Sequence, residues 1–312
     1  MYILGFDIGG TKCAVITARW DGENITIEKK DRCETDHSLT GEQMLQRLIG
    51  MADRILEGKP DSIGISCGGP LDSVTGVIID PPNLPGWKNV PIVDLLQEYY
   101  GAQVYLQNDA NACAVAEWKF GAGRDCKNMV FLTFGTGMGA GLILGGRLYE
   151  GTNGNAGEVG HIRLAEDGPE GYGKCGSFEG FCSGGGIARL GHKMALEAME
   201  KGERPLYFRK GEEITAKSIA EAAQQADPTA VAVYRIAGQY LGKGLSLLLD
   251  ILNPERIVIG SIFVRSQALL WDAMQSQINQ EALIPTARCC RIVPAALGEE
   301  IGDYAAVATA LL

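Results

Sequence analysis

Two stretches of the chain share one pattern, in which an apolar strand ends at clustered glycines and a second apolar strand follows. The first runs from YILGFDI through GGTK to CAVITARW, and the second runs from NMVFLTF (128–134) to AGLILGG. Short apolar runs separated by glycines predict buried strands joined by tight turns. Because the two stretches lie far apart in the sequence, they indicate an internal duplication of a strand–turn–strand unit.

The rest of the chain mixes helical and strand patterns, which predicts an α/β fold. A T-x-x-Q capping box at Thr40 begins a helix that ends near Gly58, and Asp227 caps a helix with Pro228 at its first position. Since no low-complexity linker separates the modules, we expect a short hinge near 109–125. Other helices are expected at 109–120, 214–226, 228–252 and 303–312, and other strands at 61–67, 103–108 and 256–260.

Composition limits the classes of partner. The net charge of −10 and the pI near 4.9 repel a phosphate backbone, so we expect no nucleic acid partner.

Nine scattered cysteines are typical of reduced thiols in a cytoplasmic protein. No basic leader precedes an apolar region, and Lys243 and Asp250 interrupt the most apolar later stretch, so we expect no membrane partner.

Two glycine clusters are candidate phosphate sites. In DIGGTK, the adjacent Gly9 and Gly10 would let the backbone approach an anion, and the carboxylate of Asp7 could hold a hydrated divalent cation, although an ordinary glycine turn has the same pattern. The cluster FGTGMGAG contains a dinucleotide-binding spacing. A strand and not a helix follows it, which excludes a Rossmann site, and no Walker loop is present.

Polar residues stand out at two further places. Asn108 and Asp109 join a strand end to a helix start, where open α/β sheets bind ligands, although helix capping alone would also favour Asp there. In GEVGH, Glu158 and His161 lie in a glycine-rich loop, and with Glu179 they supply the acceptors and the donor needed to hold a polyhydroxylated molecule.

The stretch GYGKCGSFEGFCSG (171–184) contains Cys175 and Cys182 among glycines. Their C-x6-C spacing does not match a zinc site, and no second cysteine pair lies near. From these residues alone a metal site, a disulfide loop and a ligand-binding turn all remain open.

Taken in order, several motifs resemble the ROK family (repressor, open reading frame, kinase) of bacterial sugar kinases: DIGGTK, CGGPLD, PPNLPGW, QNDAN, FGTGMGAG, GEVGH, GSFE…SG and NPERIVIG. The resemblance implies an actin-like, hexokinase-like ATPase fold of duplicated ribonuclease H-like domains, with two lobes and a central cleft. We expect one lobe at 1–109 with 303–312 and the other at 110–302.

The resemblance also implies roles for individual residues. Asp109 matches the catalytic base, and Asp7 would hold magnesium through water. The residues implied to hold or face the sugar are Gly68, Asn83, Asn108, Asp109, Glu158, His161 and Glu179. Those implied to bind ATP are Asp7, Gly9, Gly10, Thr11 and Lys12 in a first phosphate loop, Gly135, Thr136, Gly137 and Gly139 in a second, and Gly260 near the adenosine.

Most members of this family bind structural zinc through three cysteines and the histidine of the G-E-x-G-H motif. Alignment on Glu179 and the following Ser-Gly places Glu170, Tyr172 and Ser177 where those cysteines should be. The resemblance therefore implies a variant with no zinc site, in which packing of Tyr172 and Phe178 holds the turn.

The expected activity is transfer of the γ-phosphoryl group of ATP, with magnesium, to a hexose hydroxyl, giving glucose 6-phosphate from glucose in a homodimeric enzyme. Alternatives are N-acetylmannosamine, N-acetylglucosamine, fructose or allose as substrate. A sugar-responsive repressor is disfavoured because it would carry a DNA-binding domain before the first glycine loop, which starts here at Asp7. A silent sugar-binding protein would be expected to lack the base or a phosphate loop.

Overall fold

The computed structural model describes residues 1–209 and 211–312, which form two compact units. Unit 1 comprises Met1–Asp125, Gly141–Ala156 and Ala296–Leu312, and unit 2 comprises Cys126–Ala140 and Gly157–Ala295. The units differ from the predicted lobes, because 110–125, 141–156 and 296–302 belong with unit 1. One reason is Gly141, where a side chain would come within 2.4 Å of Ala114 Cβ, so that the glycine allows close packing on the helix of Ala114.

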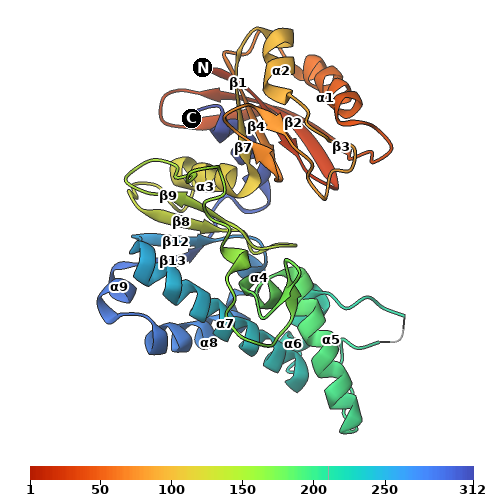
Figure 1. Ribbon diagram of the computed structural model, residues 1–312, viewed down its shortest axis with the longest axis vertical. Helices are drawn as coiled ribbons and strands as arrows, with labels where there is room; N and C mark the ends of the chain where they lie inside the picture. The colour runs from red at the N-terminus through yellow and green to blue at the C-terminus, as the bar shows by residue number, and fades with distance from the viewer. Residues whose placement is uncertain (210) are drawn as a thin grey trace. The chain divides into compact units, whose positions relative to one another are not determined.

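Unit 1 contains a five-stranded sheet of order β3-β2-β1-β4-β7 (Figure 1). The strand β1 is antiparallel to β2, with Ile8 opposite Cys13, and parallel to β4, which is parallel to β7. The elements are β1 (Tyr2–Ile8), β2 (Lys12–Trp20), β3 (Ile25–Glu34), α1 (Gly41–Ile55), β4 (Ser62–Cys67), β5 (Leu71–Asp72), β6 (Val77–Ile78), α2 (Ile92–Tyr100), β7 (Gln103–Asn108), α3 (Asp109–Phe120), η2 (Gly298–Glu300) and α10 (Ile301–Thr309).

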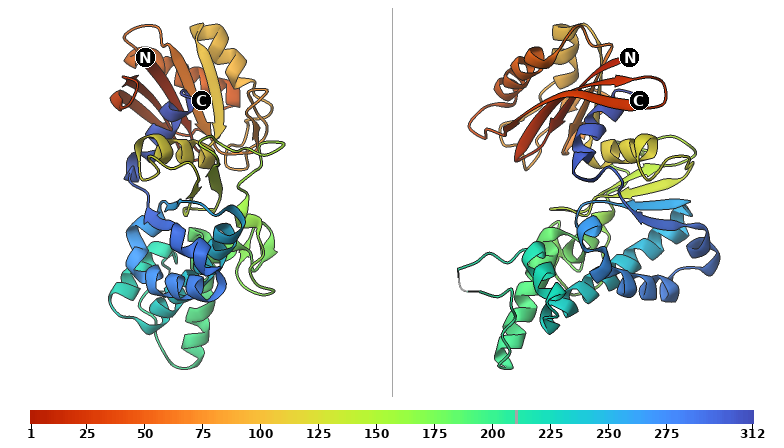
Figure 2. Two further views of the ribbon diagram at one scale, coloured as in Figure 1. Left: turned by 90° about the vertical axis from the view of Figure 1, so that its left-hand side faces the viewer. Right: turned by 180° about the vertical axis from the view of Figure 1, so that it is seen from behind.

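Helices cover both faces of this sheet (Figure 2). On one face, Leu4 and Phe6 of β1 belong to a core that also takes in buried residues of α1 and α2. On the other face, α10 packs against β1, β2 and β4. A Cβ on Gly64 would lie 2.1 Å from the carbonyl oxygen of Ala306, so the absence of a side chain at Gly64 brings α10 directly onto the sheet.

A second, four-stranded sheet has the order β13-β12-β8-β9. The strands β8, β12 and β13 are parallel, as are β1, β4 and β7 of the first sheet. The order β9-β8-β12-β13 therefore matches β2-β1-β4-β7, as the predicted duplication requires. The remaining elements are β8 (Met129–Leu132), β9 (Ala140–Ile143), η1 (Val159–His161), β10 (Glu170–Gly171), β11 (Lys174–Cys175), α4 (Phe178–Phe181), α5 (Gly184–Glu200), α6 (Ala216–Gln224), α7 (Pro228–Leu252), β12 (Arg256–Ile259), α8 (Ile262–Glu281), α9 (Ile284–Cys289) and β13 (Arg291–Pro294).

Local capping signals located several helices correctly. The Thr40–Gln43 capping box is present at α1, and the Asp227 side chain accepts from the backbone N–H of Ala230 at the start of α7. The mixed α/β class is confirmed as well. None of the helices in the described part of the chain combines the length and apolarity needed to cross a membrane.

Candidate active site

Three carboxylates of unit 1 influence one another near the end of β1. Asp7 faces α10, and a Cβ on Gly302 would lie 2.6 Å from a carboxylate oxygen of Asp7. Burial, followed by the charges of Asp303 and Asp109, raises the pKa of Asp7 to about 6, while the Lys30 ammonium opposes the shift. The accumulated negative charge makes this end of β1 suited to a cation.

The first glycine turn is packed as tightly as its sequence predicts. The N–H of Gly9 donates to the carbonyl oxygen of Lys12 at 3.1 Å. A Cβ on Gly10 would come within 2.6 Å of the carbonyl oxygen of Asn83, so only glycine fits between the turn and that loop. Thr11 and Lys12 are exposed beside it. The structure thus places the predicted sugar residue Asn83 against the predicted phosphate loop.

The junction of β7 and α3 presents Asp109 to solvent. The side chain of Asn108 caps α3 by accepting from the N–H of Ala110 at 3.0 Å, and Asp109 Oδ1 accepts from the same N–H at 2.8 Å. A Cβ on Gly69, the neighbour of Gly68, would lie 3.3 Å from Asn108 Nδ2. Helix capping therefore fixes the start of α3 and leaves the second carboxylate oxygen of Asp109 outside the capping hydrogen bond.

The second glycine cluster is a loop, not the start of a helix, which confirms that it is no Rossmann motif. It connects β8 to β9 and is closed by Thr133, whose hydroxyl accepts from the N–H of Gly139 at 2.8 Å. The N–H of Gly135 donates to the carbonyl oxygen of Gly137 at 3.1 Å. Apart from its chain neighbours, the described residue nearest to the position that a Cβ on Gly135 would take is Ser261, whose hydroxyl oxygen would lie 3.4 Å away.

Two helices of unit 2 begin beside this loop. The N–H of Gly184, the first residue of α5, donates to the carbonyl oxygen of Gly135 at 2.7 Å. The N–H of Ile262, the first residue of α8, donates to the carbonyl oxygen of Phe134 at 2.8 Å, and Gly260 ends β12 just before it. Helix N-termini carry partial positive charge, so a glycine loop between two of them is suited to phosphate.

No phosphate-binding role was predicted for the start of α5, although the GSFE…SG motif ends at its Ser183 and Gly184. The signal was present as Ser183 followed by three glycines, since a serine before glycines at a helix start is a capping residue beside an accessible backbone. The Ser183 side chain does accept from the N–H of Gly186.

Glu179 lies against the second glycine loop. Its Oε2 accepts from the N–H of Met138 at 3.0 Å and would lie 2.8 Å from a Cβ on Gly137. Its helix, α4, is fixed by Phe178, which is fully buried and fills the space left by Gly244 of α7. The predicted packing of Phe178 is confirmed, and the predicted sugar residue Glu179 also contacts the predicted phosphate loop.

Glu158 precedes the short helix η1, His161 is its last residue, and both are exposed. The ring of Tyr172 stacks on His161, with 3.8 Å between ring centroids and 30° between ring planes. The Tyr172 hydroxyl donates to Glu158 Oε2 at 3.4 Å. These three side chains therefore form one contiguous group, which we call the Tyr172 cluster.

The positions that the resemblance assigns to zinc ligands have different environments. Glu170 and Tyr172 are exposed, whereas Ser177 is fully buried and caps α4. Cys175 is exposed and Cys182 is buried, with its thiol 3.5 Å from the carbonyl oxygen of Ala237. Across residues 1–209 and 211–312, no three His, Cys, Asp or Glu side chains are placed to hold a metal ion together.

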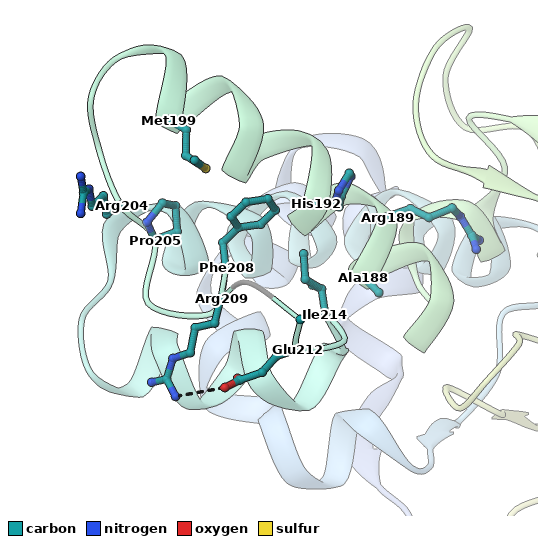
Figure 3. Close-up of a pocket in the computed structure, with 11 residues that line it drawn as sticks. Ala188, Arg189, His192, Met199, Arg204, Pro205, Phe208, Arg209, Glu212 and Ile214 are labelled. Carbon is teal, nitrogen blue, oxygen red and sulfur yellow. Dashed lines mark ion pairs between the residues drawn. The ribbon is translucent and has the colours of Figure 1, made fainter.

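A separate cavity of about 960 Å³ lies between α5 and residues 204–209 and 211–214 (Figure 3). Phe208, His192 and Ile214 lie near its middle, whereas Arg204 and Arg189 lie at opposite ends and do not converge. The cavity contains none of the predicted site residues, so it is not the candidate active site.

The structure therefore groups the predicted residues by unit. In unit 1, Asp7 lies close enough to Asp109 to share its electrostatic field, and Gly10 adjoins Asn83. In unit 2, the loop from Gly135 to Gly139 adjoins Glu179. Gly260 lies beside the same loop, because its N–H donates to Leu132 at the end of β8.

Known proteins resemble the chain over its full length. The ROK family model matches residues 3–311. A glucokinase from Halalkalibacterium halodurans is 33% identical over 309 residues, which cover 96% of this chain and 92% of the relative. A ROK family glucokinase from Streptomyces griseus, solved in complex with glucose and AMPPNP, is 30% identical with a TM-score of 0.78 over 100% of this chain and 99% of that one.

A structure described as a ROK family transcriptional regulator, a homolog of the E. coli MLC protein, has a TM-score of 0.86 at 25% identity. The alignment with this regulator covers 99% of our chain and 78% of the regulator. The chain belongs to the ROK family and has the actin-like, hexokinase-like ATPase fold that the motifs implied.

Proposed function

We propose that the chain is an ATP-dependent sugar kinase that phosphorylates a hexose hydroxyl, with glucose as the preferred substrate. The observation that carries the proposal is the glycine loop 133–139, at which the helices α5 and α8 both begin. Similarity to relatives named glucokinase, and to a glucokinase solved with glucose and AMPPNP, supports the same function.

The residues present fit a nucleotide phosphate and a magnesium ion. In unit 2, backbone N–H groups and two helix N-termini supply the positive field that phosphate requires. In unit 1, Gly10 leaves no room for a side chain, and Asp7 has a pKa raised by burial and by two other carboxylates, so it would gain from a cation. Among the described residues, Asp7 has too few neighbouring ligands to hold a metal ion by side chains alone. We therefore propose that Asp7 would hold magnesium through bound water, and that the ion would neutralise phosphate charge.

Asp109 is proposed as the general base. As the sugar hydroxyl oxygen attacks the γ-phosphorus, its proton passes to the Asp109 carboxylate, while the bond from the γ-phosphorus to the β–γ bridging oxygen breaks and ADP leaves. The hydrogen bond from Ala110 holds one carboxylate oxygen, which orients the other. We propose that the sugar hydroxyls are held by Asn108, Glu158, His161 and Glu179, with Gly68 and Asn83 in loops that face them.

A substrate panel tests the proposal and separates the alternatives. We expect ADP production, measured in a coupled assay, to be fastest with glucose among glucose, fructose, allose, N-acetylglucosamine and N-acetylmannosamine. Faster turnover of an N-acetylhexosamine would reassign the substrate within the same enzyme class. Sugar binding without ADP release from any of these would favour a sugar-responsive regulator, the alternative supported by likeness to a transcriptional regulator.

Two glutamate variants should affect the two substrates differently. Glu158→Ala removes a proposed contact to the sugar, so we expect the KM for sugar to rise at least about tenfold, because a hydrogen bond to a charged group contributes about 1.5–3 kcal/mol. The KM of the Glu158→Ala variant for ATP should be unchanged. Glu179→Ala should raise both KM values, because Glu179 also accepts from Met138 in the phosphate loop. Steady-state kinetics with each substrate varied in turn would measure both KM values for each variant. A raised KM for ATP with an unchanged KM for sugar in Glu158→Ala protein would contradict the proposed role of Glu158.

We also propose that the protein is active without zinc. His161 is the only zinc ligand of the family pattern that the alignment retains, and one ligand is too few for a structural site. Metal analysis of protein purified without chelator should find less than one zinc per ten chains, and a zinc-selective chelator in excess magnesium should leave turnover unchanged. Stoichiometric zinc, lost together with activity, would show that Cys175 or Cys182 has been recruited.

Two other features remain proposals: a homodimer and a cytoplasmic location. Light scattering coupled to size-exclusion chromatography would measure the mass in solution. A mass near 33 kDa, that of one chain, would contradict the dimer.

A further inference from the structure

Tyr172 occupies a backbone position that ordinarily excludes it. It is the first of two residues in the turn between β10 and β11, where Gly171 pairs with Lys174. Tyr172 has φ of 53° and Gly173 has φ of 69°. Two-residue turns with both φ values positive strongly favour Asn, Asp or Gly at the first position, because a bulky side chain is strained there. A tyrosine in this place needs a compensating interaction.

Two contacts of the Tyr172 side chain lead to residues that the proposed function uses. The Tyr172 ring stacks on His161, eleven residues earlier in the chain, and its hydroxyl reaches Glu158 Oε2. Gly160 makes room for the ring, since a Cβ there would lie 2.9 Å from Tyr172 and 2.3 Å from the carbonyl oxygen of Met138. One strained side chain thus contacts two proposed sugar-binding residues at once.

We propose that Tyr172 is a positioning residue that fixes the His161 ring and the Glu158 carboxylate before sugar binds, an inference that rests on the proposed function. Glu158 and His161 are exposed at the two ends of a three-residue helix and would otherwise sample several rotamers. Ordering such side chains opposes binding, so prior fixation strengthens affinity. Strain held in place by its surroundings is a known property of functional sites.

Substitution of Tyr172 by asparagine separates positioning from a purely structural role. Asparagine tolerates the left-handed conformation, so Tyr172→Asn should keep or raise the melting temperature while removing both contacts. We expect the KM for sugar to rise about threefold to tenfold, the fold-change that matches one lost aromatic stacking contact, with the KM for ATP unchanged. Tyr172→Phe keeps the ring and should retain most of the affinity.

The control is Lys174→Gln in the same hairpin, which should leave both KM values unchanged. A double-mutant cycle then tests whether Tyr172 acts through its partner: in a His161→Asn background, Tyr172→Asn should have less than a twofold further effect. Additive effects in the cycle, or an unchanged sugar KM in Tyr172→Asn protein that folds normally, would overturn the inference.

Failure of the inference and failure of the proposed function give different results. If the wild-type protein phosphorylates a sugar and Tyr172→Asn matches it in sugar KM, only the positioning role is wrong. If the wild-type protein neither binds nor phosphorylates any sugar of the panel, measured by calorimetry and by ADP release, then the proposed function is wrong and the positioning role falls with it.

Discussion

Asp109→Asn should reduce the turnover number by about 10²–10⁴ while sugar still binds. The amide cannot accept the proton of the attacking hydroxyl, and general-base catalysis is worth this much in many enzymes. The amide oxygen can still accept from the N–H of Ala110, so the start of α3 should keep its geometry. Single-turnover kinetics and calorimetric titration with glucose would measure the two quantities separately.

A suitable control is Asp94→Asn, which changes an exposed acid in the first turn of α2 and lies outside the proposed site. Its turnover should equal that of the wild-type protein. Near-normal turnover of Asp109→Asn would assign the proton to another acceptor, and loss of sugar binding together with turnover would indicate a binding role for Asp109.

Asp7→Asn should stabilise the free protein at pH 8 and weaken its affinity for magnesium and ATP. Burial raises the pKa of Asp7 to about 6, with further contributions from Asp303 and Asp109. The pKa of Asp7 is 3.8 in the unfolded chain and about 6 in the native state, so between pH 3.8 and pH 6 the native state binds more protons. The contribution of Asp7 to the free energy of unfolding therefore falls as the pH rises through this range. Asparagine removes the effect.

The full shift corresponds to about 3 kcal/mol, and partial exposure of Asp7 to water reduces the expected gain to about 1–2 kcal/mol. The melting temperature of the variant should therefore exceed that of the wild-type protein by a few degrees at pH 8, and the difference should shrink toward pH 4. Affinity for magnesium and ATP should fall about 10–100-fold, as for other groups that orient a hydrated metal.

Denaturation curves at pH 4, 6 and 8, with and without magnesium and ATP, would test both parts. A bound cation favours ionised Asp7, so saturating magnesium and ATP should stabilise the wild-type protein more than the variant. If Asp7→Asn lowers the melting temperature of the free protein at every pH, the carboxylate is stabilising and the proposed electrostatic conflict is wrong.

Elements with local signals were predicted well. The capping box at Thr40 and the Asp227–Pro228 start each depend on a few neighbouring residues, and the structure confirms the helices that follow them. The strand β3, the exposed edge of its sheet, was missed because it is rich in charge. The helices α2, α5 and α8 were also missed. The helix α2 has no side-chain cap, and α5 starts with three glycines.

For the candidate site too, the features that depend on neighbouring residues were predicted from the sequence. Glycine pairs and a polar strand end are visible in the sequence, because a tight turn requires glycine and a helix start requires a cap. The resemblance to the ROK family then assigned five residues to a sugar kinase active site: Asp7, Asp109, Glu158, His161 and Glu179. The family assignment is confirmed by the match over residues 3–311, while the roles of these residues stay proposals.

By itself, the sequence determined the positions of the turns and caps and the family, since these depend on neighbouring residues or on the order of motifs. Only the tertiary structure brought Gly302 against Asp7, Met138 against Glu179 and Tyr172 against His161. The first pair is separated by almost the whole chain, and no local pattern encodes a contact between segments that meet only when α10 packs on β1. The raised pKa of Asp7 has the same origin, because burial and the neighbouring carboxylates exist only in the folded chain.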